Sequence, residues 1–207
     1  MRVLIVEDSK YMSNLIKRKL EKFTDIEICG AAYNGKEAIE QNKILKPDCI
    51  TMDINMPVMN GIDAVAEIMS NNPAPIIMLS AYSKKDAELT IKALRYGAVD
   101  FIQKPDGEIS DIDSIIDELA KKIRNTKYIR QKKIDLRKIE QFKNLSKEET
   151  LDITVAQYVV CIGASTGGPA LLPELIGLLN PDFKAAVIIV QHMPPKYTAI
   201  FANQLAQ

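Results

Sequence analysis

The sequence has few cysteines and no long hydrophobic run, and both absences exclude whole classes of protein. Its three cysteines, Cys29, Cys49 and Cys161, are odd in number, far apart and embedded in apolar segments. This pattern indicates neither a disulfide framework nor a metal knuckle, so we expect reduced core residues. No segment approaches the ~18 apolar residues of a membrane span, and the first apolar run, Val3 to Val6, is too short for a signal peptide. We therefore expect a cytoplasmic protein without membrane insertion.

An excess of charge of one sign is also missing, because 27 basic residues balance 27 acidic ones. The balance hides an asymmetry: residues 121–147 hold 11 basic but only 2 acidic residues, a net charge of +9, which leaves −9 for the rest. From Arg124 to Lys147 the apolar residues are scattered, so we predict a solvated, partly helical linker there. Docking onto an acidic surface or weak binding of nucleic acid are the alternatives. The aromatics are too few for a single-strand platform, and we expect no nucleic-acid partner.

The remaining composition, 47% hydrophobic and 26% charged, is ordinary for a soluble globular protein. Over residues 1–124, short apolar runs alternate with stretches of helical period, which is typical of βα units around a parallel sheet. Ser9 is positioned to cap the first helix. We predict a five-stranded, doubly wound parallel sheet with strands at Val3–Val6, Ile26–Ala32, Cys49–Met52, Ile76–Leu79 and Val99–Ile102.

Charged side chains follow three of these strands. Asp53 ends the third, Glu7 and Asp8 follow the first, and Lys104 comes after the fifth. Strand ends of one polarity meet at one edge of a parallel sheet, where ligands bind, so these groups are expected to converge. Each residue alone has an ordinary interpretation, because a single aspartate at a strand end is usually a turn or cap residue.

Together, these residues resemble a response-regulator receiver domain. The resemblance implies that Asp53 accepts a phosphoryl group from a sensor kinase. It also implies that Glu7, Asp8, Asp53 and the backbone carbonyl of Asn55 hold Mg²⁺, a hard cation that prefers oxygen ligands. Ser80, Phe101 and Lys104 are the implied switch residues. The matching positions are Glu7, Asp8, Asp53, Asn55, Met56, Pro57, Ser80, Ala81, Phe101, Lys104 and Pro105.

A second apolar pattern begins near residue 157. A predicted strand runs into Gly163, Ser165 and Gly167, which fit the G-x-S-x-G turn that exposes a serine oxygen. A further strand, Ala185–Val190, precedes His192, the only histidine. If these strands are parallel, serine and histidine lie at one edge as nucleophile and base. A glycine-rich phosphate cradle and a histidine that only satisfies a carbonyl group are the alternatives.

The whole chain is similar to the chemotaxis protein-glutamate methylesterase (CheB) family. The resemblance implies a serine hydrolase that demethylates receptor glutamates and deamidates glutamines, and whose active site is uncovered when its receiver is phosphorylated. Ser165 would be the nucleophile, His192 the general base and the Thr166 backbone an oxyanion donor. The implied partners are a chemotaxis histidine kinase and the cytoplasmic domains of methylated chemoreceptors.

The chain departs from this family in lacking an obvious triad acid. Only Glu174 and Asp182 follow Ser165; the first lies on a helix that leads away, and the second is roughly 20 Å from His192 at the far end of a strand. We predict a receiver at residues 1–124, a basic linker at 125–156 and an incomplete Rossmann-like esterase domain at 157–207.

We therefore expect a fragment or truncated product with little hydrolase activity. Two other classes of function remain open. One is a phosphorylation-controlled binding protein without catalysis, and the other is a regulator that contacts DNA through the basic linker.

Overall fold

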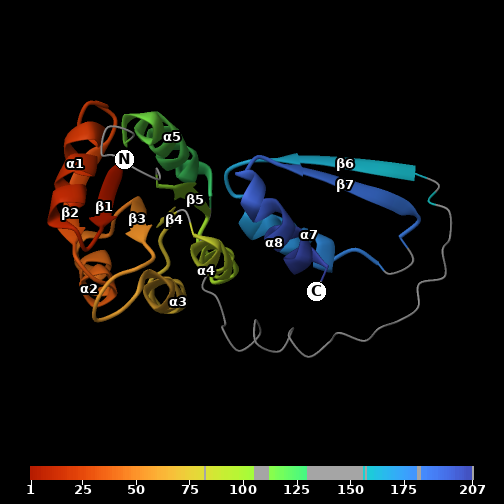
Figure 1. Cartoon of the computed structure of the whole chain (residues 1–207), viewed down its shortest axis with the longest axis horizontal. Coiled ribbons are helices and arrows are strands. Elements are labelled where there is room, and N and C mark those ends of the chain that lie inside the picture. The colour runs from red at the N-terminus through yellow and green to blue at the C-terminus, as the bar shows by residue number, and fades with distance from the viewer. Residues whose placement is uncertain (82, 105–111, 130–155, 157, 181–182, 207) are drawn as a thin grey trace.

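The computed structural model describes residues 1–81, 83–104, 112–129, 156, 158–180 and 183–206, which form a larger N-terminal unit and a smaller C-terminal unit (Figure 1). Pro105, Asp182 and most of the predicted basic linker lie outside the described residues. The three predicted domain ranges therefore stay predictions. No helix in the described ranges has both the length and the apolar character needed to cross a membrane.

The N-terminal unit is a parallel sheet with strand order β2-β1-β3-β4-β5, and every predicted strand is confirmed to within one residue. From β1 the chain adds β2 on one side and then β3, β4 and β5 on the other, so the connecting helices cover both faces of the sheet (Figure 1). The elements are β1 (Arg2–Val6), α1 (Lys10–Leu20), β2 (Glu27–Ala32), α2 (Gly35–Leu45), β3 (Cys49–Asp53), α3 (Gly61–Asn71), β4 (Ile76–Ser80), α4 (Lys84–Arg95), β5 (Asp100–Gln103) and α5 (Ile112–Asn125), followed by a 3₁₀ turn, η2 (Thr126–Tyr128).

Alternate residues of each strand enter two separate cores. In β1, Val3 and Ile5 pack beneath α1 and α5, whereas Leu4 and Val6 belong to the core beneath α2, α3 and α4. All four side chains are completely buried. Successive side chains of a strand point to opposite faces, so a strand covered on both sides reads as a continuous apolar run. This is why the strands of the N-terminal unit appear in the sequence as continuous apolar runs rather than as alternating apolar and polar residues.

The helices begin where polar side chains cap their free amides. Ser9 accepts a hydrogen bond from the Met12 amide, as predicted, and Asn60 accepts one from the Asp63 amide at the start of α3. Asn34 and Ser83 cap α2 and α4 in the same way. The caps on α2, α3 and α4 set where these helices leave the loops around the site described below.

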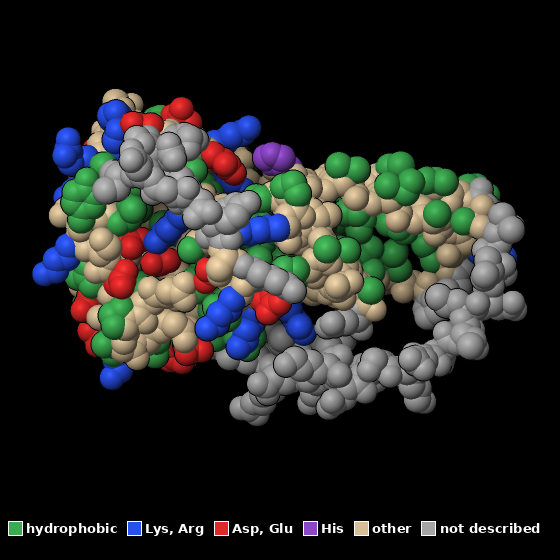
Figure 2. Space-filling view, viewed as in Figure 1, with side chains coloured by type: hydrophobic (Ala, Val, Ile, Leu, Met, Phe, Trp, Pro, Cys, Tyr) green, Lys and Arg blue, Asp and Glu red, His purple; other side chains and the backbone are tan. Residues whose placement is uncertain are grey.

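The C-terminal unit is a two-stranded parallel sheet with two helices: β6 (Tyr158–Ala164), α7 (Gly168–Gly177), β7 (Ala185–Gln191) and α8 (Pro195–Leu205). α8 packs beside α4 and α7 beside β5 (Figure 1). Along the two strands, apolar side chains gather on the surface (Figure 2); Val159 is 62% exposed and Val190 68%. Cys161 is exposed on β6, so its prediction as a core residue was wrong, because the two-stranded sheet is not covered on both faces there.

Candidate functional site

Three carboxylates converge at the carboxyl edge of the N-terminal sheet. Asp53 is the last residue of β3, and Glu7 and Asp8 follow β1, which is the neighbouring strand. One carboxylate oxygen from each of the three lies within 4.8 Å of the others. Glu7 and Asp53 are buried, whereas Asp8 is exposed. The predicted convergence is therefore confirmed, and the cluster is open to solvent on the Asp8 side.

Lys104 joins the cluster from the end of β5. Its Nζ lies 2.7 Å from Glu7 Oε2 and 3.0 Å from Asp53 Oδ2. Burial raises the pKa of both carboxyl groups, and the Lys104 ammonium opposes this shift only in part. Burial also disfavours the ammonium, but the Asp53 and Glu7 charges outweigh it, so the pKa of Lys104 rises. One ammonium thus holds two buried carboxylates.

This donor set fits a hard divalent cation. Carboxylate oxygens from adjacent strand ends are the ligands that Mg²⁺ takes in proteins. A cation would also offset the burial that raises the pKa of Glu7 and Asp53. Asn55 lies in the following loop, where its side-chain amide donates to Asp86 Oδ1 at 2.8 Å. The role of its backbone carbonyl as a ligand stays a prediction.

The other two predicted switch residues, Ser80 and Phe101, lie on β4 and β5. Ser80, the last residue of β4, is completely buried, and Phe101 on β5 is 3% exposed. The Ser80 hydroxyl lies 2.7 Å from the Thr90 hydroxyl and 3.1 Å from the Tyr197 hydroxyl. Sequence reasoning missed Thr90 and Tyr197. A sequence signal for Tyr197 was its spacing of four from Phe201 on α8, which places two aromatics on one helix face.

Ser165 and His192 follow the two paired strands of the C-terminal unit. Ala164 and Gln191 form the last pair of the register, and the His192 amide donates to the Ala164 carbonyl at 2.9 Å. Ser165 and His192 are both exposed, and the histidine lies on the surface where the two units meet (Figure 2). The parallel strands therefore bring the serine and histidine backbones to one edge, as predicted.

The loop that carries Ser165 rests on the N-terminal unit. Gly167, whose φ of 83° suits glycine, donates its amide to the Val99 carbonyl at 3.2 Å. Thr166 Oγ1 accepts from Asn125 Nδ2 at 3.4 Å. Thr166 as an oxyanion donor stays a prediction. This loop is held in place by the beginning of β5 and the end of α5.

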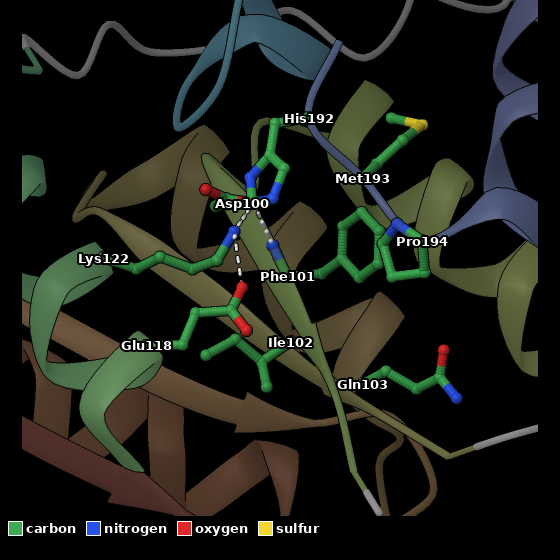
Figure 3. A pocket seen from close by; sticks show the side chains of 9 residues that line it. All are labelled: Asp100, Phe101, Ile102, Gln103, Glu118, Lys122, His192, Met193 and Pro194. Atoms are coloured by element: carbon green, nitrogen blue, oxygen red, sulfur yellow. Dashed lines mark hydrogen bonds and ion pairs between the residues drawn. The ribbon is translucent and has the colours of Figure 1, made fainter. Parts of the chain in front are cut away.

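A pocket of 230 Å³ separates His192 from the N-terminal unit, and Asp100 and Lys122 line it from below (Figure 3). Lys122 Nζ lies 2.8 Å from Asp100 Oδ1. Of the two acidic residues that follow Ser165 in the sequence, Glu174 is exposed on α7, which leads away from Ser165. Asp182 lies outside the described residues.

Replacement of Lys104 by methionine is expected to destabilise the folded protein by about 3 kcal/mol at neutral pH, because two buried carboxylates lose their partner. The raised pKa of Lys104 contributes stability below its ordinary value of 10.5, so the contribution is fully present at neutral pH. In the variant, Glu7 and Asp53 are both charged above their raised pKa values, and these buried charges without a partner destabilise the folded state. The destabilisation becomes smaller as the pH falls, because one of the two carboxylates then takes a proton.

Thermal unfolding measured against pH tests this expectation. The difference in melting temperature between the variant and the parent protein should shrink on acidification, and added Mg²⁺ should stabilise the variant more than the parent. Lys36→Met, at an exposed position of α2, is the matched control and should change little. A Lys104 variant as stable as this control at neutral pH would contradict the role of the ammonium.

Two protein families match the chain: the response regulator receiver domain over residues 3–117 and the CheB methylesterase over residues 160–207. The protein-glutamate methylesterase/protein-glutamine glutaminase of Pyrococcus horikoshii is 40% identical over 205 residues, which is 99% of this chain and 56% of that protein. The corresponding protein of Caldanaerobacter subterraneus is 42% identical over 216 residues, covering 100% of this chain and 58% of that protein. The chain thus spans a little more than half the length of these curated relatives.

Among solved structures, the response regulator domain of Thermotoga maritima CheB is similar to the N-terminal unit. It is 44% identical, with a TM-score of 0.59, and the match covers 63% of this chain and 98% of that chain. The sheet order, the carboxylate cluster and these matches all indicate the receiver fold for residues 3–117.

Proposed function

The chain belongs to the response regulator receiver family and continues into residues that match the CheB methylesterase family, and we propose that it receives a chemotaxis signal as a phosphoryl group on Asp53. The donor is the phosphohistidine of a sensor kinase. An Asp53 carboxylate oxygen forms a bond to phosphorus as the phosphorus–nitrogen bond breaks, and the imidazole leaves with the electron pair. This reaction is phosphoryl transfer between two residues, with no free phosphate released.

The arrangement of Lys104 opposite the three carboxylates is the observation that carries this proposal. Attack by a carboxylate on a phosphoryl group brings anions together, so positive charge must be fixed in place beforehand. Glu7, Asp8 and Asp53 would hold Mg²⁺, which supplies charge neutralisation for the phosphoryl oxygens. Lys104 is placed to pair with the acyl phosphate once it forms.

We further propose that residues 158–206 contribute the serine and histidine of a hydrolase that acts on chemoreceptors. Ser165 would attack the carbonyl carbon of the methyl ester of a receptor glutamate or of the side-chain amide of a glutamine, and His192 would take the serine proton. His192 would pass that proton to the leaving group as the carbon–oxygen or carbon–nitrogen bond breaks, so that methanol or ammonia leaves, and water would then hydrolyse the acyl-serine to the glutamate carboxylate. Their exposed positions after adjacent parallel strands support this assignment. With Glu174 on a helix that leads away and apolar strand residues open to solvent, we expect this polypeptide to show little demethylation by itself.

Metal dependence tests the phosphorylation step directly. Incubated with Mg²⁺ and a small phosphodonor such as acetyl phosphate, the protein should gain one phosphoryl group, detected by intact mass, that is stable in acid and labile in base. Addition of excess chelator before the phosphodonor should prevent the gain, because the carboxylate cluster then lacks its cation. Equal labelling with and without the chelator would contradict the proposed site.

A further inference from the structure

Asp86, in the first turn of α4, is bonded to the loop that follows Asp53. Asp86 is 6% exposed, and its Oδ1 accepts a hydrogen bond from the side-chain amide of Asn55 at 2.8 Å. Asn55 comes two residues after Asp53, between β3 and α3, whereas Asp86 lies 31 positions further along the chain. The bond therefore joins the start of α4 to the loop that carries the predicted backbone ligand of the cation.

Capping of α4 explains only part of the contacts that Asp86 makes. The Asp86 amide donates to Ser83 Oγ at 3.0 Å, and the Ser83 hydroxyl donates to Asp86 Oδ2. The start of α3 has a similar arrangement, in which the Asp63 amide donates to Asn60 Oδ1 at 2.9 Å and Asp63 Oδ2 accepts from the Asn60 side chain at 2.8 Å. These bonds of Asp63 stay within the start of its own helix. Oδ1 of Asp86 instead contacts Asn55 in another loop, which a helix cap does not require.

The loop that contains Asn55 has a strained backbone. Val58 has a φ of 68°, a left-handed conformation that costs a β-branched residue on the order of 1–3 kcal/mol and persists only where the surroundings hold it. Toward α3, the Gly35 amide holds the loop by donating to the Met59 carbonyl at 2.9 Å. Toward β3, the Asn55 side chain is bonded to the carboxylate of Asp86, which is a stronger acceptor than a neutral oxygen. The bond to Asp86 therefore helps to keep this loop in one conformation.

We propose that Asp86 is a positioning residue for the divalent cation, because it holds the Asn55 side chain and thereby orders the loop of a predicted ligand before the cation binds. This inference rests on the proposed function, in which the carboxylate cluster and the Asn55 backbone carbonyl hold Mg²⁺. Asp86 is not a member of the cluster of Glu7, Asp8 and Asp53, so it acts through Asn55. Residues that orient a metal ligand in this way commonly change metal affinity by about 10-fold to 100-fold.

The test measures the affinity for Mg²⁺ by titration calorimetry, without a phosphodonor. Asp86→Ala removes the acceptor of the Asn55 amide and should weaken Mg²⁺ binding about 10-fold, at the lower end of the effects of such residues. Asp86→Asn lacks the charge but keeps an acceptor oxygen, so it should bind Mg²⁺ more tightly than Asp86→Ala. Asp63→Ala is the matched control, because it removes the same charge and a similar capping contact from α3; it should leave the Mg²⁺ affinity unchanged.

A double-mutant cycle separates positioning from loss of a helix cap. Asn55→Ala removes the side chain and retains the backbone carbonyl, and the fold should tolerate it because Asn55 is exposed. It should also weaken Mg²⁺ binding about 10-fold. If the two side chains act through their bond, Asp86→Ala should cause no further loss of Mg²⁺ affinity when it is added to Asn55→Ala. Thermal unfolding without Mg²⁺ measures the effect of each variant on the stability of the fold.

The outcomes separate this inference from the proposed function. If the parent chain does not bind Mg²⁺ at all, the proposed cation site is wrong and the inference fails with it. If the parent chain binds and Asn55→Ala binds equally tightly, the positioning role is overturned, however well the Asp86 variants fold. Asp86→Asn binding as weakly as Asp86→Ala overturns it too, because loss of charge then explains the effect, and so do losses that add in the double variant. Equal, non-additive losses in Asn55→Ala and Asp86→Ala, with Asp63→Ala unchanged, support it.

Discussion

Replacing Asp53 with asparagine is expected to lower phosphoryl incorporation from acetyl phosphate more than about 100-fold, to background. The amide has nearly the shape of the carboxylate, but its oxygen is a much weaker nucleophile and carries no charge for a cation. Asp53 is buried at the end of β3, with one carboxylate oxygen 3.0 Å from Lys104 and the other accepting from the Ile54 amide at 2.8 Å. The fold should therefore tolerate the change, while the chemistry should not.

Intact mass measured after incubation with Mg²⁺ and acetyl phosphate checks this result. Asp117→Asn, at an exposed position on α5, is the matched control and should be labelled like the parent chain. Circular dichroism of both variants should show an unchanged fold. Full labelling of a folded Asp53→Asn protein would assign the phosphoryl group to another carboxylate and refute the proposed receiver chemistry.

Gly61→Ala is expected to lower the free energy of unfolding by about 3 kcal/mol and to abolish phosphorylation. The Gly61 amide donates to the Ile54 carbonyl at 2.9 Å, which brings the start of α3 against the end of β3. A methyl group at Gly61 would collide with the backbone carbonyl oxygen of Asp53. Because the neighbour is backbone inside the sheet, it cannot turn aside as a side chain could, and α3 or Asp53 must move.

Urea unfolding of Gly61→Ala and Gly177→Ala provides the comparison. Alanine is the better helix former by about 1 kcal/mol, so a glycine without steric constraint should gain stability or stay neutral on substitution. A methyl group at Gly177, at the end of α7, would meet nothing within 4 Å. If Gly61→Ala were as stable as the parent and were still phosphorylated, the close approach of α3 to Asp53 would not be required for the site.

The receiver site was predictable because its residues follow apolar strands, and the alternation of strands with helices indicates that these strands run parallel. Glu7, Asp53 and Lys104 are far apart in sequence, yet each stands at or just after the end of a strand, and parallel strands align such ends at one edge. The cap at Ser9 was predictable for a similar reason, because side-chain capping involves residues only three positions apart.

The contacts between the two units were not predictable in this way. Nothing near Tyr197 in the sequence indicates that its hydroxyl reaches Ser80, 117 positions earlier. The prediction for Cys161 failed for the same reason: an apolar strand pattern does not say whether a second layer covers the strand.

The sequence by itself determined the parallel sheet, the carboxylate edge and the alternation of strands and helices, because these depend on side-chain periodicity and on local geometry. Only the tertiary structure decided that Lys104 pairs with both Glu7 and Asp53, that α8 lies against α4, and that Tyr197 fills the space beside Phe101. Such contacts depend on how completed elements pack, and packing is set by the joint shape and burial of residues from distant segments.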